Sequence, residues 1–166
     1  ADTATVTVAT SPPPPPPDIN AFTEFQNLET VGAWDWEYFC IGEEHFLALA
    51  NYYNAASGKY NQTSKIYKWN GYTFGTFQKI STNGAFDWEY FSFDGDHYLA
   101  LANYYNNSSH NINSRIFKWD GTSFTQFQNI STNGARDWEY FTIDGEPYLA
   151  VANSDKDTTC NINSRI

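Results

Sequence analysis

Aromatic and aliphatic residues alternate with polar ones in short runs along most of the chain, and no stretch keeps the 3.6-residue period of a helix. After about residue 20 the runs follow one order: 22–28 (FTEFQNL), 36–41 (WEYFCI), 45–51 (HFLALAN) and 64–69 (SKIYKW). The turn sequence IGEE separates the second run from the third, and a long polar loop separates the third from the fourth. The pattern predicts four short antiparallel strands.

The four-strand pattern occurs three times. The motif DWEYF begins at residues 35, 87 and 137, in steps of 52 and 50, and the pair FQ recurs with the same steps. Periods of this length are typical of propellers and other repeat architectures, and four antiparallel strands describe one propeller blade. We therefore expect an all-β fold of three tandem four-stranded antiparallel repeats of β-propeller-blade type, at 21–70, 71–120 and 121–166.

Residues 1–20 form a segment of different composition, rich in Thr and Pro. Six consecutive prolines, 12–17, favour a rigid polyproline II linker, and the neighbouring Thr and Ser residues suit O-glycosylation. The stretch TATVTVAT alternates Thr with Val, so it is either an extended tail or a strand donated to an open sheet edge.

Composition narrows the class of function. The net charge of −10 argues against nucleic-acid binding, which needs clustered Lys and Arg, and no apolar run is long enough to span a membrane. The chain has no Met, and a mature end beginning ADTAT fits removal of a secretory signal peptide, so we expect a secreted, extracellular protein. Phosphate-binding loops, nucleophile elbows and paired CxxC motifs are missing from the sequence, which favours a non-enzyme.

Each DWEYF motif places two acids among aromatic residues. Residues two apart in a strand share a face, so Asp35 and Glu37 point one way and Trp36 and Tyr38 the other. Three equivalent copies are typical of a structural element, whereas glycosidase chemistry needs one pair of carboxyls in different environments. We expect no catalytic residue and no cofactor other than a calcium ion, for which a ring of carboxylates is the alternative reading. The candidate calcium ligands are Asp35, Asp87 and Asp137.

Aromatic residues also mark the end of the third predicted strand. The motif ANYYN at 50–54 and 102–106 opens the long loop, and the third repeat has ANSDKD instead. Tyr and Asn are frequent recognition residues, and loops that vary on a constant scaffold are where partner binding is expected, although a simple polar loop is the alternative. The candidate partner-binding residues are Trp34, Tyr52, Tyr53, Tyr104 and Tyr105.

Two cysteines and four glycosylation sequons bear on the extracellular reading. Cys40 and Cys160 allow one disulfide within the chain, pairing between chains, or two free thiols. N-glycans are expected on a secreted chain at the Asn-x-Ser/Thr acceptors. These acceptors are Asn61, Asn106, Asn107 and Asn129.

Several linked motifs together resemble the epilepsy-associated repeat, also called the EAR or EPTP repeat. The matching stretches are FQNISTNGARDWEYFTIDGEPYLAVAN, SRIFKWDG and IYKW, and the likeness covers about residues 21–166. The resemblance implies a β-propeller in an extracellular protein-interaction module without a catalytic role. The family typically strings together around seven repeats and this sequence shows three, so we expect part of a larger array or an assembly of several chains.

The sequence therefore favours an extracellular, non-enzymatic repeat protein for protein–protein recognition or adhesion, with other proteins or copies of itself as partners. One alternative is a structural subunit of an extracellular filament or sheath, assembled head-to-tail through its N-terminal strand and open sheet edges. A second alternative is a glycan-binding, lectin-like module that uses loop Tyr residues and Trp34.

Overall fold

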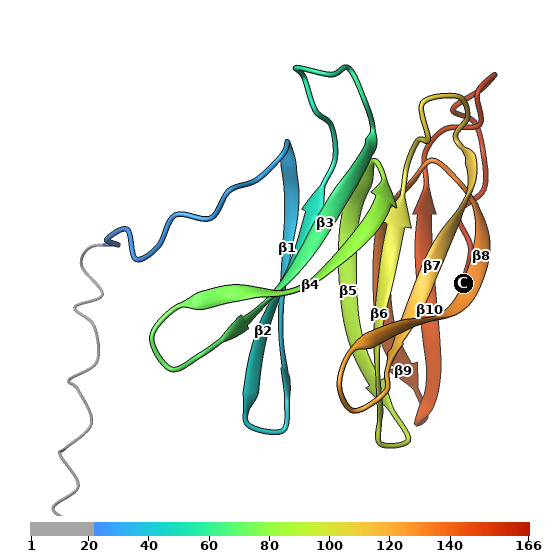
Figure 1. Cartoon of the computed structure of the whole chain (residues 1–166). Coiled ribbons are helices and arrows are strands. Elements are labelled where there is room, and N and C mark those ends of the chain that lie inside the picture. Colours follow the sequence, from blue (N-terminus) through green and yellow to red (C-terminus); the bar gives the residue numbers. More distant parts are fainter. Residues whose placement is uncertain (1–21) are drawn as a thin grey trace, which may run out of the picture.

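The computed structural model describes residues 22–166, and the tail and linker predicted for residues 1–20 lie outside this range. The described residues form ten β-strands, which confirms the predicted all-β class (Figure 1). None of them forms a helix long and apolar enough to cross a membrane. The strands are β1 (Ala33–Ile41), β2 (Glu44–Asn51), β3 (Asn61–Trp69), β4 (Phe74–Asn83), β5 (Ala85–Phe93), β6 (Asp96–Asn103), β7 (Asn111–Trp119), β8 (Phe124–Asn133), β9 (Ala135–Ile143) and β10 (Glu146–Asn153).

The strands form three antiparallel sheets in chain order. The first sheet has the order β1-β2-β3-β4, the second β5-β6-β7-β8, and the third contains β10 and β9. An isolated bridge joins Val151 to Arg165, in the register that joins Leu101 to Arg115 in the second sheet. Residues 161–166 therefore lie where a third strand of the third sheet would begin.

The strand predicted at 22–28 is wrong for this structure, where these residues form no regular secondary structure and pair with no strand among residues 22–166. The equivalent segments 74–80 and 124–130 lie in β4 and β8, which pair with the strand before them in the chain, β3 and β7. Each four-stranded sheet thus takes its outer strand from the next sequence repeat. Residues 22–28 remain unpaired because no sheet precedes them in the described chain, and the repeat boundaries 21–70, 71–120 and 121–166 stay a prediction.

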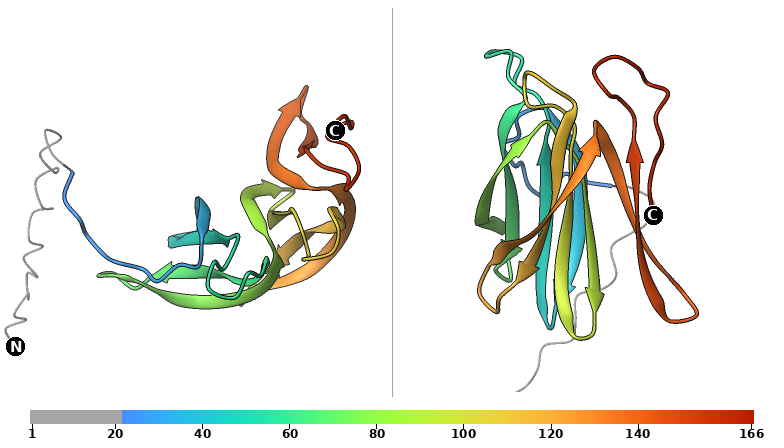
Figure 2. Two further views of the ribbon diagram at one scale, coloured as in Figure 1. Left: turned by 90° about the horizontal axis from the view of Figure 1, so that it is seen from above. Right: turned by 90° about the vertical axis from the view of Figure 1, so that its right-hand side faces the viewer.

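The three sheets follow one another along an open arc and do not close into a ring in the described residues (Figure 2). The first strands of the sheets, β1, β5 and β9, lie next to one another in turn. Two apolar cores fill the spaces between sheets, one containing Trp88 and the other Trp138, and these side chains are only 1% and 3% exposed. A single sheet has no core of its own, because its apolar side chains are buried only against the neighbouring sheet.

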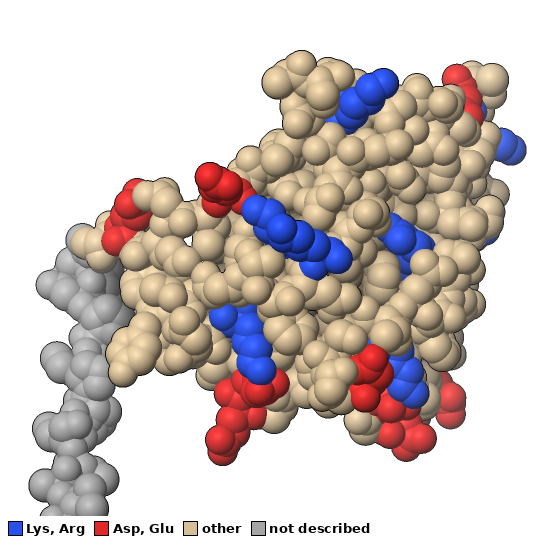
Figure 3. Space-filling view, in the orientation of Figure 1, with Lys and Arg blue, Asp and Glu red and all other residues tan. Residues whose placement is uncertain are grey.

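Charged side chains are sparse on the face shown in Figure 3, where acidic groups gather at the lower end, over the hairpin turns. Two acids next to the hairpin turns form ion pairs with cations on the neighbouring strands, Glu44 with Lys68 and Asp96 with Lys118. Exposed pairs of this kind contribute about 0–1 kcal/mol, so the apolar spaces between sheets hold the arc together.

Candidate functional site

The acids of the first two DWEYF motifs lie at the junctions between sheets. The Asp35 carboxylate accepts a hydrogen bond from the backbone N–H of Trp88, with an Oδ2···N distance of 3.2 Å. Glu37 accepts one from the N–H of Tyr90, with an Oε1···N distance of 3.0 Å. Both side chains leave the first sheet on one face and reach β5 of the second sheet, so the pair joins two sheets through the main chain.

The same junction recurs between the second and third sheets. Asp87 accepts from the N–H of Trp138 and Glu89 from the N–H of Tyr140, each at 2.8 Å. Aromatic rings accompany both junctions: Phe91 stacks on Tyr140 at a centroid distance of 4.9 Å, in the geometry that Phe39 makes with Tyr90 at the first junction. The repeated acids therefore act as acceptors for a neighbouring sheet.

Burial changes the protonation of these carboxyls. Loss of water raises the pKa of Glu37 to about 7 and that of Asp87 to about 8, since burial disfavours the charged form. The backbone N–H groups act in the opposite direction, and neighbouring carboxylates add to the rise. Asp35 and Glu89 have a raised pKa for the same leading reason.

The third sheet presents its acids differently. Asp137 and Glu139 are exposed and accept no hydrogen bond from residues 22–166. Among these residues no group of three or more His, Cys, Asp or Glu side chains is placed to hold a metal ion. Asp35 and Asp87 direct their carboxylates to backbone donors, and the calcium site stays a prediction.

Sequence reasoning missed a buried polar network at the end of the third predicted strand. The side chain of Asn103 is fully buried, donates to the backbone oxygen of Asn113 (2.9 Å) and accepts from the N–H of Asn83 (3.0 Å). Ser114 accepts from the N–H of Asn103 and shares a hydrogen bond with Thr132. The signal was present in the repeats, as the Asn of each Ala-Asn pair recurs together with a Ser 13, 11 or 11 residues later. The equivalents of Asn103 are Asn51 and Asn153.

A glutamine side chain links outer strands in a similar way. Gln78 on β4 both donates to the backbone oxygen of Phe124 (2.7 Å) and accepts from its N–H (2.9 Å). Gln26 makes the same two hydrogen bonds with Phe74, at 2.9 Å each, although residues 22–28 form no strand. The repeated FQ pair therefore marks a contact between consecutive sheets.

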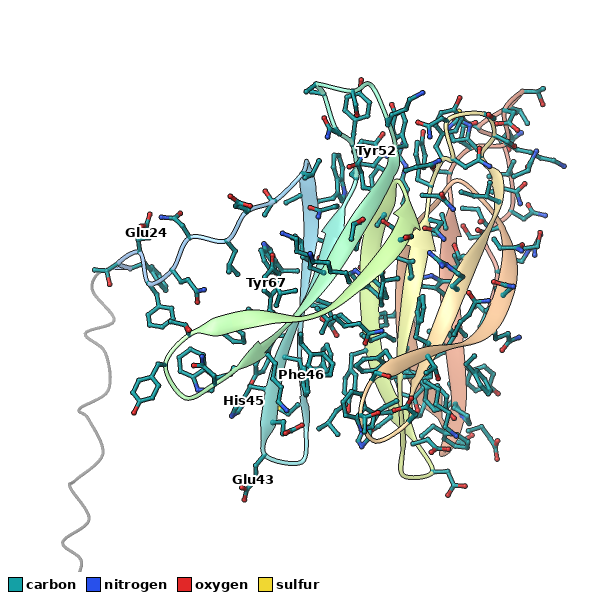
Figure 4. All side chains as sticks on the ribbon, in the orientation of Figure 1. Glu24, Glu43, His45, Phe46, Tyr52 and Tyr67 are labelled. Atoms are coloured by element: carbon teal, nitrogen blue, oxygen red, sulfur yellow. The ribbon has the colours of Figure 1, made fainter. Side chains whose placement is uncertain are left out.

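The predicted partner-binding residues come together at one end of the sheets, where Tyr52 lies in Figure 4. Trp34 is 57% exposed and packs on Tyr52 and Phe86, with ring centroids 5.2 and 4.4 Å away. Tyr60 packs on Tyr105 across the junction at 5.0 Å. Loops of both four-stranded sheets contribute to this aromatic cap. The aromatic cap consists of Trp34, Tyr52, Tyr53, Tyr60, Phe86, Tyr104, Tyr105 and His110.

Local backbone geometry builds the aromatic cap. Trp34 is the extra residue of a β-bulge, because Ala33 pairs with Asn51 and Asp35 with the adjacent Ala50. In the second repeat, Gly84 comes just before the equivalent bulge. Gly84 has φ +56° and lies so close to the loop after β6 that an added Cβ would be 3.2 Å from the backbone oxygen of Tyr105. Because the glycine has no side chain, the loop can pack directly against it. The bulge turns the side chain that varies between repeats, which is Trp34 in the first, toward the aromatic cap.

The two cysteines are free thiols in the structure. Cys40 pairs across the β1–β2 hairpin with His45, and its Sγ lies 3.2 Å from Nδ1 of that residue and 3.1 Å from the hydroxyl of Tyr38. The hairpin register could have revealed this contact. Cys160 lies in the loop after β10, whereas Cys40 lies beside His45 at the other end of the sheets in Figure 4. A disulfide between neighbouring chains stays a prediction.

The four sequons divide into two groups. Asn61 and Asn129 are exposed residues of β3 and β8. Asn106 and Asn107 are half-buried in the loop after β6, and the Asn107 side-chain oxygen accepts from the N–H of Tyr60 at 2.7 Å across the junction. Glycosylation of these residues stays a prediction, and Asn107 already has a structural role.

Antiparallel sheets joined by repeated carboxylate, amide and aromatic contacts define an all-β repeat protein with propeller-type blades. Within this class the chain belongs to the EPTP domain family, which matches residues 21–70, 73–120 and 123–166 and confirms the EAR/EPTP resemblance. The Homo sapiens protein named "Thrombospondin-type laminin G domain and EAR repeat-containing protein" is 41% identical over 92 residues, or 54% of this chain and 14% of that protein. The Mus musculus protein of the same name is 40% identical over 92 residues, or 54% of this chain and 13% of that protein.

Proposed function

We propose that this chain is an extracellular, non-enzymatic repeat protein that recognises other proteins through its aromatic cap. The observation that carries the proposal is the cap itself, a cluster of packed rings from strands and loops of two sheets, in which Trp34 is the most exposed member at 57%. Tyr and Trp supply rigid contact area at low entropic cost and are enriched at protein interfaces. The cap loops differ in length and sequence between repeats while the sheets stay constant, as expected of a recognition surface on a scaffold.

Two further observations support the proposal. The acid pairs that could have suggested catalysis at Asp35, Glu37, Asp87 and Glu89 are engaged by backbone N–H groups of the next sheet. The matched human and mouse proteins carry a thrombospondin-type laminin G domain in their name, which supports an extracellular setting. The family match supports protein–protein interaction as the role of the repeats.

Photo-crosslinking tests the proposal. A photoreactive group at Ser57, an exposed cap-side loop residue, would be activated in the secreted protein fraction of the source organism, and the captured partner would be purified for binding measurements. Trp34→Ala should weaken that binding by about tenfold or more, since exposed Trp residues at interface centres are frequent hot spots. Tyr72→Ala is the matched control, because Tyr72 is an exposed ring (83%) in the β3–β4 turn outside the cap.

Equal binding by wild type, Trp34→Ala and Tyr72→Ala would refute recognition through the cap. A glycan array probed with the deglycosylated chain separates the lectin alternative. Array binding that Trp34→Ala abolishes, without any captured protein, would replace the proposed function by glycan binding.

A further inference from the structure

Four rings form a continuous row across the junction between the first two sheets. The ring centroids of Tyr53 and Tyr60 are 4.7 Å apart, and those of Tyr60 and Tyr105 are 5.0 Å apart. His110 follows, at 4.4 Å from Tyr105. The loops between β2 and β3 and between β6 and β7 contribute two rings each and lie at the same end of the molecule (Figure 1). These four residues are the ring ladder, which bridges two complete four-stranded sheets and depends on neither outer face of the arc.

Hydrogen bonds between the two loops hold the ring ladder in place. The backbone N–H of Tyr60 donates to the side-chain oxygen of Asn107 (2.7 Å), and its carbonyl accepts from the N–H of Gly84 (2.6 Å). At the far end, the backbone N–H and Nδ1 of His110 lie 2.6 and 2.9 Å from Oδ1 of Asp157. A surface that is ordered in this way loses little conformational entropy when it binds.

The ring ladder offers both apolar faces and hydroxyl donors. Its four rings are half-buried, so each keeps part of its surface in contact with solvent. Within residues 22–166, the hydroxyls of Tyr53 and Tyr105 are left without a hydrogen-bond partner, unlike those of Tyr67 and Tyr90. A suitable ligand therefore has an apolar surface and hydrogen-bond acceptors.

A polyproline II segment has both properties. Proline has no backbone N–H, and polyproline II forms no internal hydrogen bonds, so its carbonyls are acceptors that a hydroxyl can reach. Aromatic-lined surfaces recognise this conformation because it is already ordered before binding, which lowers the entropic cost. One turn of polyproline II spans about 9 Å, which is comparable with two steps of the ring ladder.

The chain itself contains such a segment. Residues 12–17 are six consecutive prolines and lie outside the described residues. At about 3.1 Å per residue they would extend over about 19 Å, enough to cover the ring ladder. The segment carries no charge, which suits a chain of net charge −10 that would repel an acidic ligand.

The position of the prolines favours the ring ladder of another copy. Only residues 18–21 separate them from the described chain. That chain begins at the side of the first sheet, where Glu24 lies in Figure 4, whereas Tyr52 marks the end that carries the cap. Four residues make a short connection for reaching that end within one chain.

We propose that the ring ladder binds the Pro12–Pro17 segment of a second copy of this chain. The inference rests on the proposed function, because the ring ladder is part of the aromatic cap. Proline rings pack against the ladder rings, and proline carbonyls accept hydrogen bonds from the hydroxyls of Tyr53 and Tyr105. Each chain brings both the ladder and the prolines, so the contact is head-to-tail and chains add one after another.

Peptide binding is the first test. The full 166-residue chain with Pro12→Ala to Pro17→Ala removes the competing segment, and a synthetic peptide of residues 10–18 (TSPPPPPPD) is titrated into it by calorimetry. We expect saturable binding of one peptide per chain. A matched peptide with Ala at the six proline positions should not bind.

Three substitutions locate the binding surface on the same background. Tyr105→Ala should weaken peptide binding by about tenfold or more, as loss of an aromatic contact residue does. Tyr105→Phe keeps the ring and its packing, and loss of the hydroxyl donor should weaken binding by about fivefold. Tyr72→Ala, which removes an exposed ring (83%) outside the cap, should leave binding unchanged.

Mass in solution identifies the source of the prolines. Light scattering of the wild-type chain should give a mass that rises above 18.9 kDa with concentration. The six-proline variant keeps the ladder, and Tyr60→Ala with Tyr105→Ala keeps the prolines, so each variant alone should stay at the chain mass. An equimolar mixture should reach twice the chain mass and no more, because its one remaining ladder–proline pairing joins one chain of each kind.

Equal binding of the proline and alanine peptides, or no binding of either, would overturn the proposal. Peptide binding by a wild-type chain that stays at the chain mass at every concentration would overturn the second copy as the source of the prolines. These failures are distinguishable from failure of the proposed function. A captured partner that depends on Trp34 and is not displaced by the proline peptide would refute polyproline binding and leave recognition through the cap standing.

Discussion

At the residue scale, the repeated buried amide is the feature on which each sheet depends. Asn51, Asn103 and Asn153 end β2, β6 and β10, and each side chain bonds two backbone groups that otherwise lack a strand partner there. Buried backbone groups must be hydrogen-bonded, and leaving one unsatisfied costs about 1–3 kcal/mol. The Asn of the repeated motif is therefore a structural residue.

Asn103→Ala tests this role. The substitution leaves the Asn113 carbonyl and the Asn83 N–H without their partner, so the free energy of unfolding should fall by about 2–4 kcal/mol. Urea denaturation followed by Trp fluorescence measures it. Asn113→Ala is the control, because that side chain is exposed on the adjacent strand, and its loss should cost less than about 0.5 kcal/mol. Equal losses in the two variants would contradict the assignment.

At the scale of elements, the junction between sheets is a row of partly buried carboxyls. Those of Glu37 and Asp87 have ordinary pKa values of 4.5 and 3.8, which burial raises to about 7 and about 8. Between about pH 4 and 8 the folded protein holds protons that the unfolded chain has released. The free energy of unfolding therefore falls as the pH rises through this window.

The melting temperature should consequently be lower at pH 8 than at pH 5, by about 2–4 °C for each kcal/mol lost in a chain of this length. Asp87→Asn should reduce the decline, because the amide oxygen still accepts from Trp138 but no longer titrates. Asp94→Asn, at an exposed turn, should leave the decline unchanged. The melting temperature is read by circular dichroism from pH 5 to 8, and a value that rises with pH would contradict the junction electrostatics.

At the scale of the whole molecule, stability belongs to pairs of sheets. The first core cluster takes Phe39, Phe46 and Ile66 from the first sheet and Trp88 and Leu101 from the second. A repeat unit that buries its apolar face only against a neighbour cannot fold alone. The arc is therefore one cooperative structure.

A fragment of residues 33–83, the complete first sheet, should remain unfolded, with narrow amide proton dispersion and no near-ultraviolet dichroism. The fragment 33–133, which holds both four-stranded sheets and their junction, should fold, because it retains the first core cluster. Nuclear magnetic resonance spectra of the two fragments make the comparison. A cooperative melt by the single-sheet fragment would show that each sheet is stable without a neighbour.

Repetition in the sequence determined the local features of this protein. The alternating pattern and the steps of 52 and 50 predicted an all-β chain and the ten strands β1 to β10, and the motifs carried the EPTP resemblance. These features depend on period-two alternation and on turn residues, and both can be recognised within a few consecutive residues of the sequence. Identical copies of Asp35 also indicated a structural role, since the same motif recurs in every unit.

Only the tertiary structure decided what the repeated side chains contact. The outer strand of each four-stranded sheet comes from the next repeat, so the strand predicted at 22–28 has no partner strand among residues 22–166. The hydrogen bonds of Asp35 and Asp87 join residues more than 50 positions apart in the chain, and no local pattern specifies which backbone N–H a carboxylate will reach. The exposure of Trp36, against the burial of Trp88 and Trp138, likewise depends on which sheet has a neighbour, and that is a property of the arc as a whole.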